Sequence, residues 1–178
     1  MKKNVLFMVC ALLGSALLFT ACGKEDDPDI RDLAAGNYQG NVTMYALNFD
    51  NEMEEREDIF GAAPQLEASA YVEKGSGNKT MIINVGDKYN CTNISAASNG
   101  FTFDIETQTT ENDETIIGFD VATLDGNQYN GIFLENNKEL QFGVKIDVVD
   151  LDVSETVFNK LLDEEISYVV LVYELEKL

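Results

Sequence analysis

Alternation of apolar and polar side chains is the main signal along the chain from Asn37 onward. It is clearest at residues 101–106 and 140–148, where every second side chain is apolar. A period of two is typical of a strand with one buried and one solvated face. Shorter runs rich in β-branched and aromatic residues predict further strands at residues 38–49, 66–73, 80–85, 88–95, 115–123, 128–134 and 166–176.

Turn signals separate the predicted strands and indicate how they connect. Asn99-Gly100 and Asp125-Gly126 are typical of two-residue hairpin turns, because these residues tolerate a positive φ. The short connections leave no room for the helical crossovers of a parallel sheet. The sequence therefore predicts an all-β fold, an antiparallel up-and-down meander of about eight or nine strands that closes into a barrel.

One short helix is predicted before the last strand. Ser154 is a suitable N-cap for a segment in which Val157, Phe158, Leu161 and Leu162 fall on one face. We expect this apolar stripe to pack against the sheet or to close one end of the barrel.

The first residues predict an export signal rather than part of the fold. Two lysines precede an apolar run of about 15 residues, which is shorter than the roughly 20 residues of a membrane-spanning helix. The run ends in Phe19-Thr20-Ala21-Cys22, which resembles the bacterial lipobox. This resemblance implies signal cleavage between Ala21 and Cys22, and attachment of the chain to the lipid bilayer through an acylated Cys22. The alternative is an ordinary secretory signal with a chance cysteine.

An acidic run follows Cys22 and predicts an extended, solvated spacer. It resembles the surface-export tether of lipoproteins from the Bacteroidota, which implies an outer-membrane lipoprotein exposed at the cell surface. The alternative is a plain spacer that leads to the periplasmic face of the outer membrane. The predicted organisation is a lipoprotein signal peptide at residues 1–21, an acidic tether at 22–32 and a single β-barrel domain at 33–178.

Charge and composition exclude several functions. The chain has 12 basic and 32 acidic residues and a formal net charge of −20. Residues 1–21 hold two lysines and no acid, so the predicted mature chain of 157 residues carries −22. Such a chain lacks the basic patch that nucleic-acid binding needs. It also has no His, which excludes Ser-His, Cys-His and His-metal mechanisms.

The sequence predicts neither an enzyme nor a cofactor. Cys91 is the one cysteine outside the predicted signal and lipid-attachment site, so no disulfide can form within the mature chain. We expect Cys91 to be a small buried residue on a strand rather than a nucleophile, because no His is available to activate its thiol. No catalytic residue, cofactor site or metal ligand is predicted.

The segment 32–43 resembles the start of the first strand in calycin-like, lipocalin-related lipoproteins of the Bacteroidota. In that group a Gly-x-aromatic motif opens the strand and the aromatic side chain plugs the barrel floor, and Gly36 and Tyr38 occupy these places. Lipocalins proper favour Trp and stack an Arg from a late strand on that aromatic. The chain departs from them because it has no Trp, and because its arginines, Arg31 and Arg56, are both early. The resemblance implies a small calycin-like barrel that holds an apolar ligand.

The segment 50–58 holds six acidic residues and one arginine. It lacks the mid-loop glycine and the ligand spacing of an EF-hand calcium loop, so a solvated loop between the first two strands is the preferred interpretation. In calycin-like barrels this connection is often a lid over the open end, and residues 59–64 would supply its apolar contact.

Two hypotheses of function remain. In the first, the barrel is a non-catalytic binding module for a small apolar or amphipathic ligand. In the second, the barrel is filled by its own side chains and serves as a cell-surface interaction protein for a glycan or protein partner. Tyr129, Phe133, Phe142 and Val144 are the expected inward residues, and an interior cavity below ~300 Å³ would favour the second hypothesis.

Overall fold

The computed structural model describes residues 29–61, 65–97, 99–109, 115–134, 138–151 and 153–178. The predicted signal peptide, Ala21, Cys22 and the tether up to residue 28 lie outside the described residues. The strands are β1 (Gly36–Leu47), β2 (Met53–Glu54), β3 (Gln65–Lys74), β4 (Met81–Val85), β5 (Asp87–Ala97), β6 (Gly100–Ile105), β7 (Gln108–Thr109), β8 (Thr115–Gly118), β9 (Ala122–Leu124), β10 (Asn127–Tyr129), β11 (Gly131–Leu134), β12 (Glu139–Asp147) and β13 (Tyr168–Lys177). The helices are α2 (Ile30–Ala34), α3 (Glu57–Phe60), α4 (Glu155–Asp163) and the short 3₁₀ turn η1 (Val148–Asp150).

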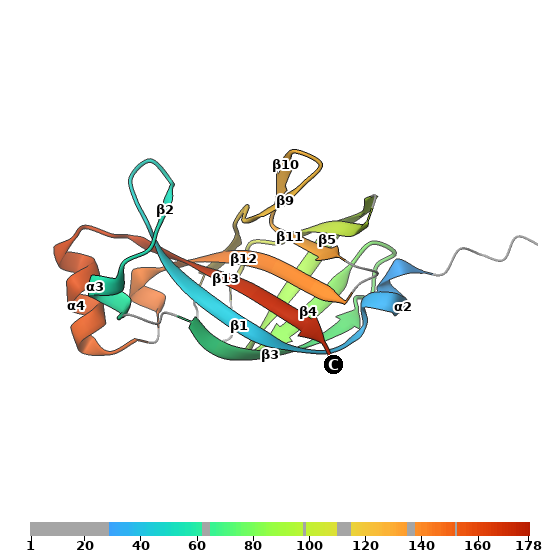
Figure 1. The fold of residues 1–178 in the computed structure, drawn as a ribbon, viewed down its shortest axis with the longest axis horizontal. Helices are drawn as coiled ribbons and strands as arrows, with labels where there is room; N and C mark the ends of the chain where they lie inside the picture. Colours follow the sequence, from blue (N-terminus) through green and yellow to red (C-terminus); the bar gives the residue numbers. More distant parts are fainter. Residues whose placement is uncertain (1–28, 62–64, 98, 110–114, 135–137, 152) are drawn as a thin grey trace, which may run out of the picture.

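Eight of the strands form a closed ring in which each strand is antiparallel to both neighbours (Figure 1). The order around the ring is β1, β3, β4, β5, β6, β11, β12 and β13, and β13 pairs again with β1. Ring neighbours follow one another along the chain, apart from the first and last strands, β1 and β13, which close the ring. The short strands β2 and β7 to β10 lie between successive ring strands in the sequence. The predicted antiparallel up-and-down meander is therefore confirmed, and α4 lies before the last strand as predicted.

One position of the ring is shared by two short strands, β8 and β11. The first half of β12 pairs with β11, and its second half pairs with β8. Between β8 and β11 the chain leaves the ring and folds into the β9–β10 hairpin, which turns at Asp125 and Gly126 with φ of 52° and 81°. The hairpin predicted there is confirmed. The prediction of two unbroken strands at 115–123 and 128–134 is wrong. The first is interrupted where the chain leaves the ring after β8, and the second where the chain returns to it at β11.

The interruption has a packing cause on the outside of the ring. Phe119 and Val121 continue the apolar alternation of β8, but they pack on a cluster formed by outward side chains of β1 and β13, namely Leu47, Val170 and Val172. The chain crosses β12 at Gly143, where a Cβ would overlap Val121. Asn130 fills the gap in the pairing, since its side chain accepts a hydrogen bond from the Ile105 amide at 3.0 Å.

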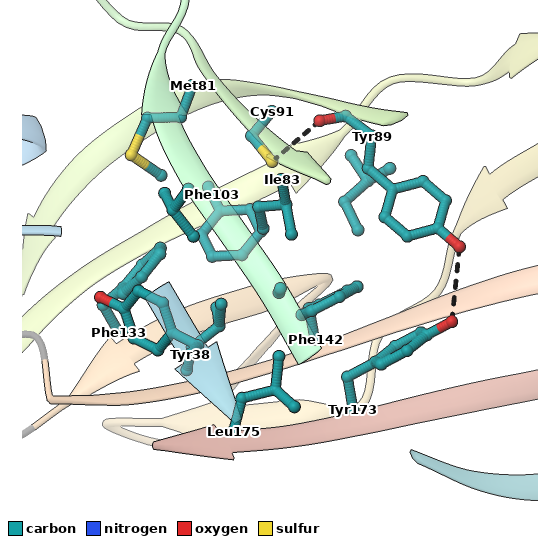
Figure 2. Packing of buried hydrophobic residues seen from close by; sticks show 14 of the residues in the cluster. Tyr38, Met81, Ile83, Tyr89, Cys91, Phe103, Phe133, Phe142, Tyr173 and Leu175 are labelled. Carbon is teal, nitrogen blue, oxygen red and sulfur yellow. Dashed lines mark hydrogen bonds between the residues drawn. The ribbon is translucent and has the colours of Figure 1, made fainter. Parts of the chain in front are cut away.

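The main core lies inside the ring, and all eight ring strands contribute to it (Figure 2). A second apolar cluster, the cap cluster, closes the ring end near α4. Its buried members come from β1, α3, η1, α4 and β13 and the turn before β13: Ala46, Ile59, Val148, Leu161, Ile166 and Val169. Figure 1 places α2 at the opposite end of the ring from α3 and α4.

Candidate functional site

The interior of the ring, where a small ligand was expected, is occupied by aromatic side chains. The Phe101 and Phe133 rings stack with centroids 4.5 Å apart, and the Phe142 and Tyr173 rings stack at 4.4 Å. The Tyr89 ring meets the edge of Phe142 at 5.8 Å. These are the centroid spacings of directly packed aromatic pairs, so side chains fill this part of the interior.

Three of the four expected inward residues are placed as predicted. Phe133, Phe142 and Val144 are fully buried in the main core. The prediction for Tyr129 is wrong, because Tyr129 lies on the β9–β10 hairpin, which belongs to a separate two-stranded sheet. The chain returns to the ring at Gly131, two residues after Tyr129, so the apolar run that suggested an inward side chain crosses from one sheet to another.

Tyr38 lies inside the ring at the α2 end. Its side chain is fully buried, and its hydroxyl donates a hydrogen bond to the Ala34 carbonyl of α2 at 2.7 Å. Burial raises the pKa of the phenol above its ordinary range. The Lys177 ammonium, from the end of β13, lies 5.9 Å from the centre of the Tyr38 ring and donates to the Leu33 carbonyl at 2.6 Å. A cation from the last strand therefore lies near this aromatic, and it is a lysine rather than the arginine of lipocalins.

Cys91 is buried on β5, as predicted. Its thiol faces the main core and contacts the Tyr89 carbonyl at 3.8 Å (Figure 2). Burial raises the pKa of the thiol far above its ordinary value, so the reactive thiolate is suppressed.

Residues 29–32, assigned to the tether by the sequence, form the start of α2 in the structure. Asp29 caps the helix by accepting from the Arg31 amide at 3.0 Å, and the Arg31 side chain reaches the Gly77 carbonyl of the β3–β4 turn. Lys74 of β3 forms ion pairs with Asp29 and Asp32. Hydrogen bonds from the Arg31 side chain hold the pKa of Asp29 far below its usual range. These contacts fix the first described residues to the ring.

The acidic segment 50–58 connects β1 to α3 and carries β2. The Arg56 guanidinium contacts Asp58 at 2.7 Å and Glu164, the C-cap of α4, at 3.5 Å, and Lys160 of α4 donates to the Asp58 carbonyl. The Arg56 hydrogen bonds lower the pKa of Asp58. Ile59 is buried and Phe60 packs on the cap cluster, as expected of a lid; residues 62–64 lie outside the described residues.

Three exposed apolar side chains gather beside the cap cluster: Phe49, Val149 and Leu162, which are 81%, 70% and 48% exposed. We call these three residues the apolar patch. They line one surface depression of about 490 Å³ whose acidic lining residues are Asp147 and Glu165. The sequence placed Leu162 on the buried stripe of α4, which is wrong. Leu161 alone is fully buried there, Val157 and Phe158 are half-buried, and Leu162 is directed away from the cluster.

Two further depressions lie on the outside of the ring. One, of about 510 Å³, follows β1, β13 and β12 and is lined mainly by Asn, Gln and Glu side chains. Glu139 and Glu176 stand directly opposite one another in it, a cross-strand pair of like charges. The other, of about 440 Å³, lies between the β1–β2 turn and the base of the β9–β10 hairpin.

Among the described residues, no cluster of three or more His, Cys, Asp and Glu side chains is arranged to hold a metal ion. No helix in the described part of the chain is long and apolar enough to span a membrane. Comparison of the chain with protein-family models, with curated proteins and with solved structures gave no match.

Proposed function

We propose that this chain is an outer-membrane lipoprotein, acylated at Cys22 and exposed at the cell surface, whose calycin-like barrel is filled by its own side chains. In this proposal the domain is non-catalytic and binds a glycan or protein partner through its outer surface. The observation that carries the proposal is the stacked aromatic interior, because it occupies the space that a small apolar ligand would need.

The contacts of Tyr38 support the calycin-like part of the proposal. An aromatic residue just after the glycine that begins the first strand is buried at one end of the ring, and a cation from the last strand lies near it. The ring of eight antiparallel strands is of the size at which side chains can fill the interior.

The position of α2 supports the outer-surface part of the proposal. The first described residues are fixed at the α2 end, and α4, which carries Leu162 of the apolar patch, lies at the other end of the ring in Figure 1. A chain tethered through its N-terminus would therefore carry the apolar patch on the side away from the bilayer.

Native mass spectrometry of a soluble form tests the filled interior. This form should begin at Lys24, because Asp29 caps α2 and must be kept. We expect the mass of the polypeptide alone, and no gain when a long-chain fatty acid is added. A lipid or fatty acid bound at a 1:1 ratio would favour the first hypothesis, that of a hollow barrel with a small apolar ligand.

Lipid attachment is tested with two matched cysteine variants of the full chain. Cys22→Ala should abolish incorporation of labelled palmitate and release the protein from the membrane fraction. Cys91→Ala, which changes a buried residue of the ring, should leave both unchanged. Labelling that persists in Cys22→Ala would refute the anchor.

A further inference from the structure

We infer that the apolar patch binds a basic, amphipathic segment of a partner protein. This inference rests on the proposed function, since it names the surface and the class of partner through which the filled domain would act. Phe49, Val149 and Leu162 come from three separate segments of the chain and share one depression. Exposed apolar side chains that gather in this way are typical of interaction sites.

The turn after β1 holds Phe49 in its exposed position. The Asn48 side chain accepts hydrogen bonds from the amides of Asp50 and Glu52, both at 2.9 Å, and donates to Glu54 at 2.8 Å. Asn51 completes the turn with a φ of 60°. Because the side chain of Asn48 braces the turn, Phe49 is presented to solvent before any partner binds. An exposed aromatic on a hydrogen-bonded turn is a typical energetic anchor of an interface.

Negative charge surrounds the anchor on the α4 side. The helix ends at Asp163, and Glu164 and Glu165 follow it directly, at the end where the helix dipole already places negative partial charge; Lys160 is the one basic residue of its last turn. Glu165 has a φ of 58°, a left-handed conformation that favours glycine. Among the described residues, the one ion pair at this helix end is that of Glu164 with Arg56, which also contacts Asp58. A cationic partner would relieve this unfavourable arrangement.

The negative charge around the apolar patch distinguishes between the partners that could bind there. A second copy of the mature chain would bring another formal charge of −22 to an acidic rim, and an acidic glycan or anionic lipid surface would be repelled in the same way. The depression offers Phe49, Val149 and Leu162 to apolar side chains and carboxylates to cations. An amphipathic segment that places aliphatic residues on one face and Lys or Arg on the other matches both features.

The test uses the full chain in phosphatidylcholine nanodiscs and a fluorescein-labelled helical peptide of Leu and Lys, with binding followed by anisotropy. We expect saturable binding that weakens at high salt, and an affinity about tenfold lower for Phe49→Ala. Leu178→Ala is the matched control, because Leu178 is equally exposed but lies outside the apolar patch, and it should bind like the wild type. A Leu/Glu peptide and a Leu/Lys peptide of scrambled order should bind at least tenfold more weakly.

Equal binding by wild type and Phe49→Ala, or equal binding of the ordered and scrambled peptides, would overturn the inference. A Phe49-dependent self-association or glycan binding without peptide binding would also overturn it, while leaving the proposed function intact. A lipid in the interior of the soluble form would instead refute the proposed function. The two failures are therefore distinguishable.

Discussion

The two ends of the ring are closed in different ways. At the α2 end, Tyr38 is buried beneath the helix, and Asp29, Arg31 and Lys74 bind the helix to the ring. At the α4 end, an aliphatic cluster is covered by α3 and α4, and the apolar patch beside it remains exposed.

The two ends differ in how well their helices follow the local rules for capping residues and for charge near the helix dipole. The short helix at the α2 end begins with an acidic cap, as the helix dipole favours. The helix at the α4 end finishes at Asp163 and is followed by Glu164 and by Glu165, which has a left-handed conformation. Departures from local stability rules that gather in one place are typical of functional sites. The contacts of α2 fix it to the ring, and the departures near the end of α4 support the proposal that this end serves recognition.

Phe133→Ala is expected to have the largest effect, because it removes a fully buried ring near the α2 end. The Phe133 ring stacks on Phe101 at 4.5 Å and meets the edge of Tyr38 at 5.9 Å. We expect the free energy of unfolding to fall by about 3–5 kcal/mol, measured by urea denaturation. Tyr71→Ala, on the exposed face of β3, is the control and should cost about 0.5 kcal/mol or less. Similar small effects for both variants would contradict a filled interior.

Leu161→Ala should have a smaller and more local effect. Leu161 is fully buried in the cap cluster, and its truncation should cost about 2–3 kcal/mol. Hydrogen exchange should show α3 and α4 losing protection while the paired strands β1 and β13 keep theirs, because these strands also contribute to the main core, which does not include Leu161. Leu162→Ala is the matched control and should leave exchange unchanged. Equal loss of protection throughout the ring would show that the α4 end is not a separate unit.

The ring was predictable from sequence because its strands repeat one simple pattern. Residues such as Phe101, Phe103 and Ile105 alternate with more polar neighbours and all face the main core. The exit at residues 119–130 was not predictable, because Phe119 and Val121 continue the alternation although their partners lie outside the ring. Periodicity reports that a face is apolar, and it does not report which surface covers that face.

The apolar patch was also beyond prediction, for two physical reasons. Its residues lie on three segments that only the closed ring brings together, and no local pattern links them. Leu161 and Leu162 are neighbours on one broad helical face, but the packing of α4 buries Leu161 and leaves Leu162 exposed. The signal that could have suggested a site was local, namely three consecutive acids at the expected C-terminus of a helix.

Glu165→Gly tests whether the left-handed conformation of Glu165 lowers the stability of the fold. Glycine occupies left-handed φ values without the steric cost that a side chain brings, so we expect the free energy of unfolding to rise by about 1 kcal/mol. Thermal unfolding at neutral pH measures this gain. Glu174→Gly, on β13, is the control, and it should destabilise because glycine weakens a strand interior. A loss of stability in Glu165→Gly would show that Glu165 is not an unfavourable residue at the α4 end.

The smallest expected effect is an acid-dependent weakening of the α2 end. The folded structure lowers the pKa of Asp29 through the Arg31 hydrogen bonds, so folding favours the charged carboxylate. The stabilisation is therefore complete above the unfolded pKa of about 3.9 and is lost as pH falls toward the lower folded pKa. Urea denaturation between about pH 5 and pH 2 should show a shallower acid loss in Asp29→Asn than in the wild type. Arg31→Gln should flatten the profile in the same way, because the two side chains act as a pair; unchanged profiles in both variants would mean that the pair does not fix α2 to the ring.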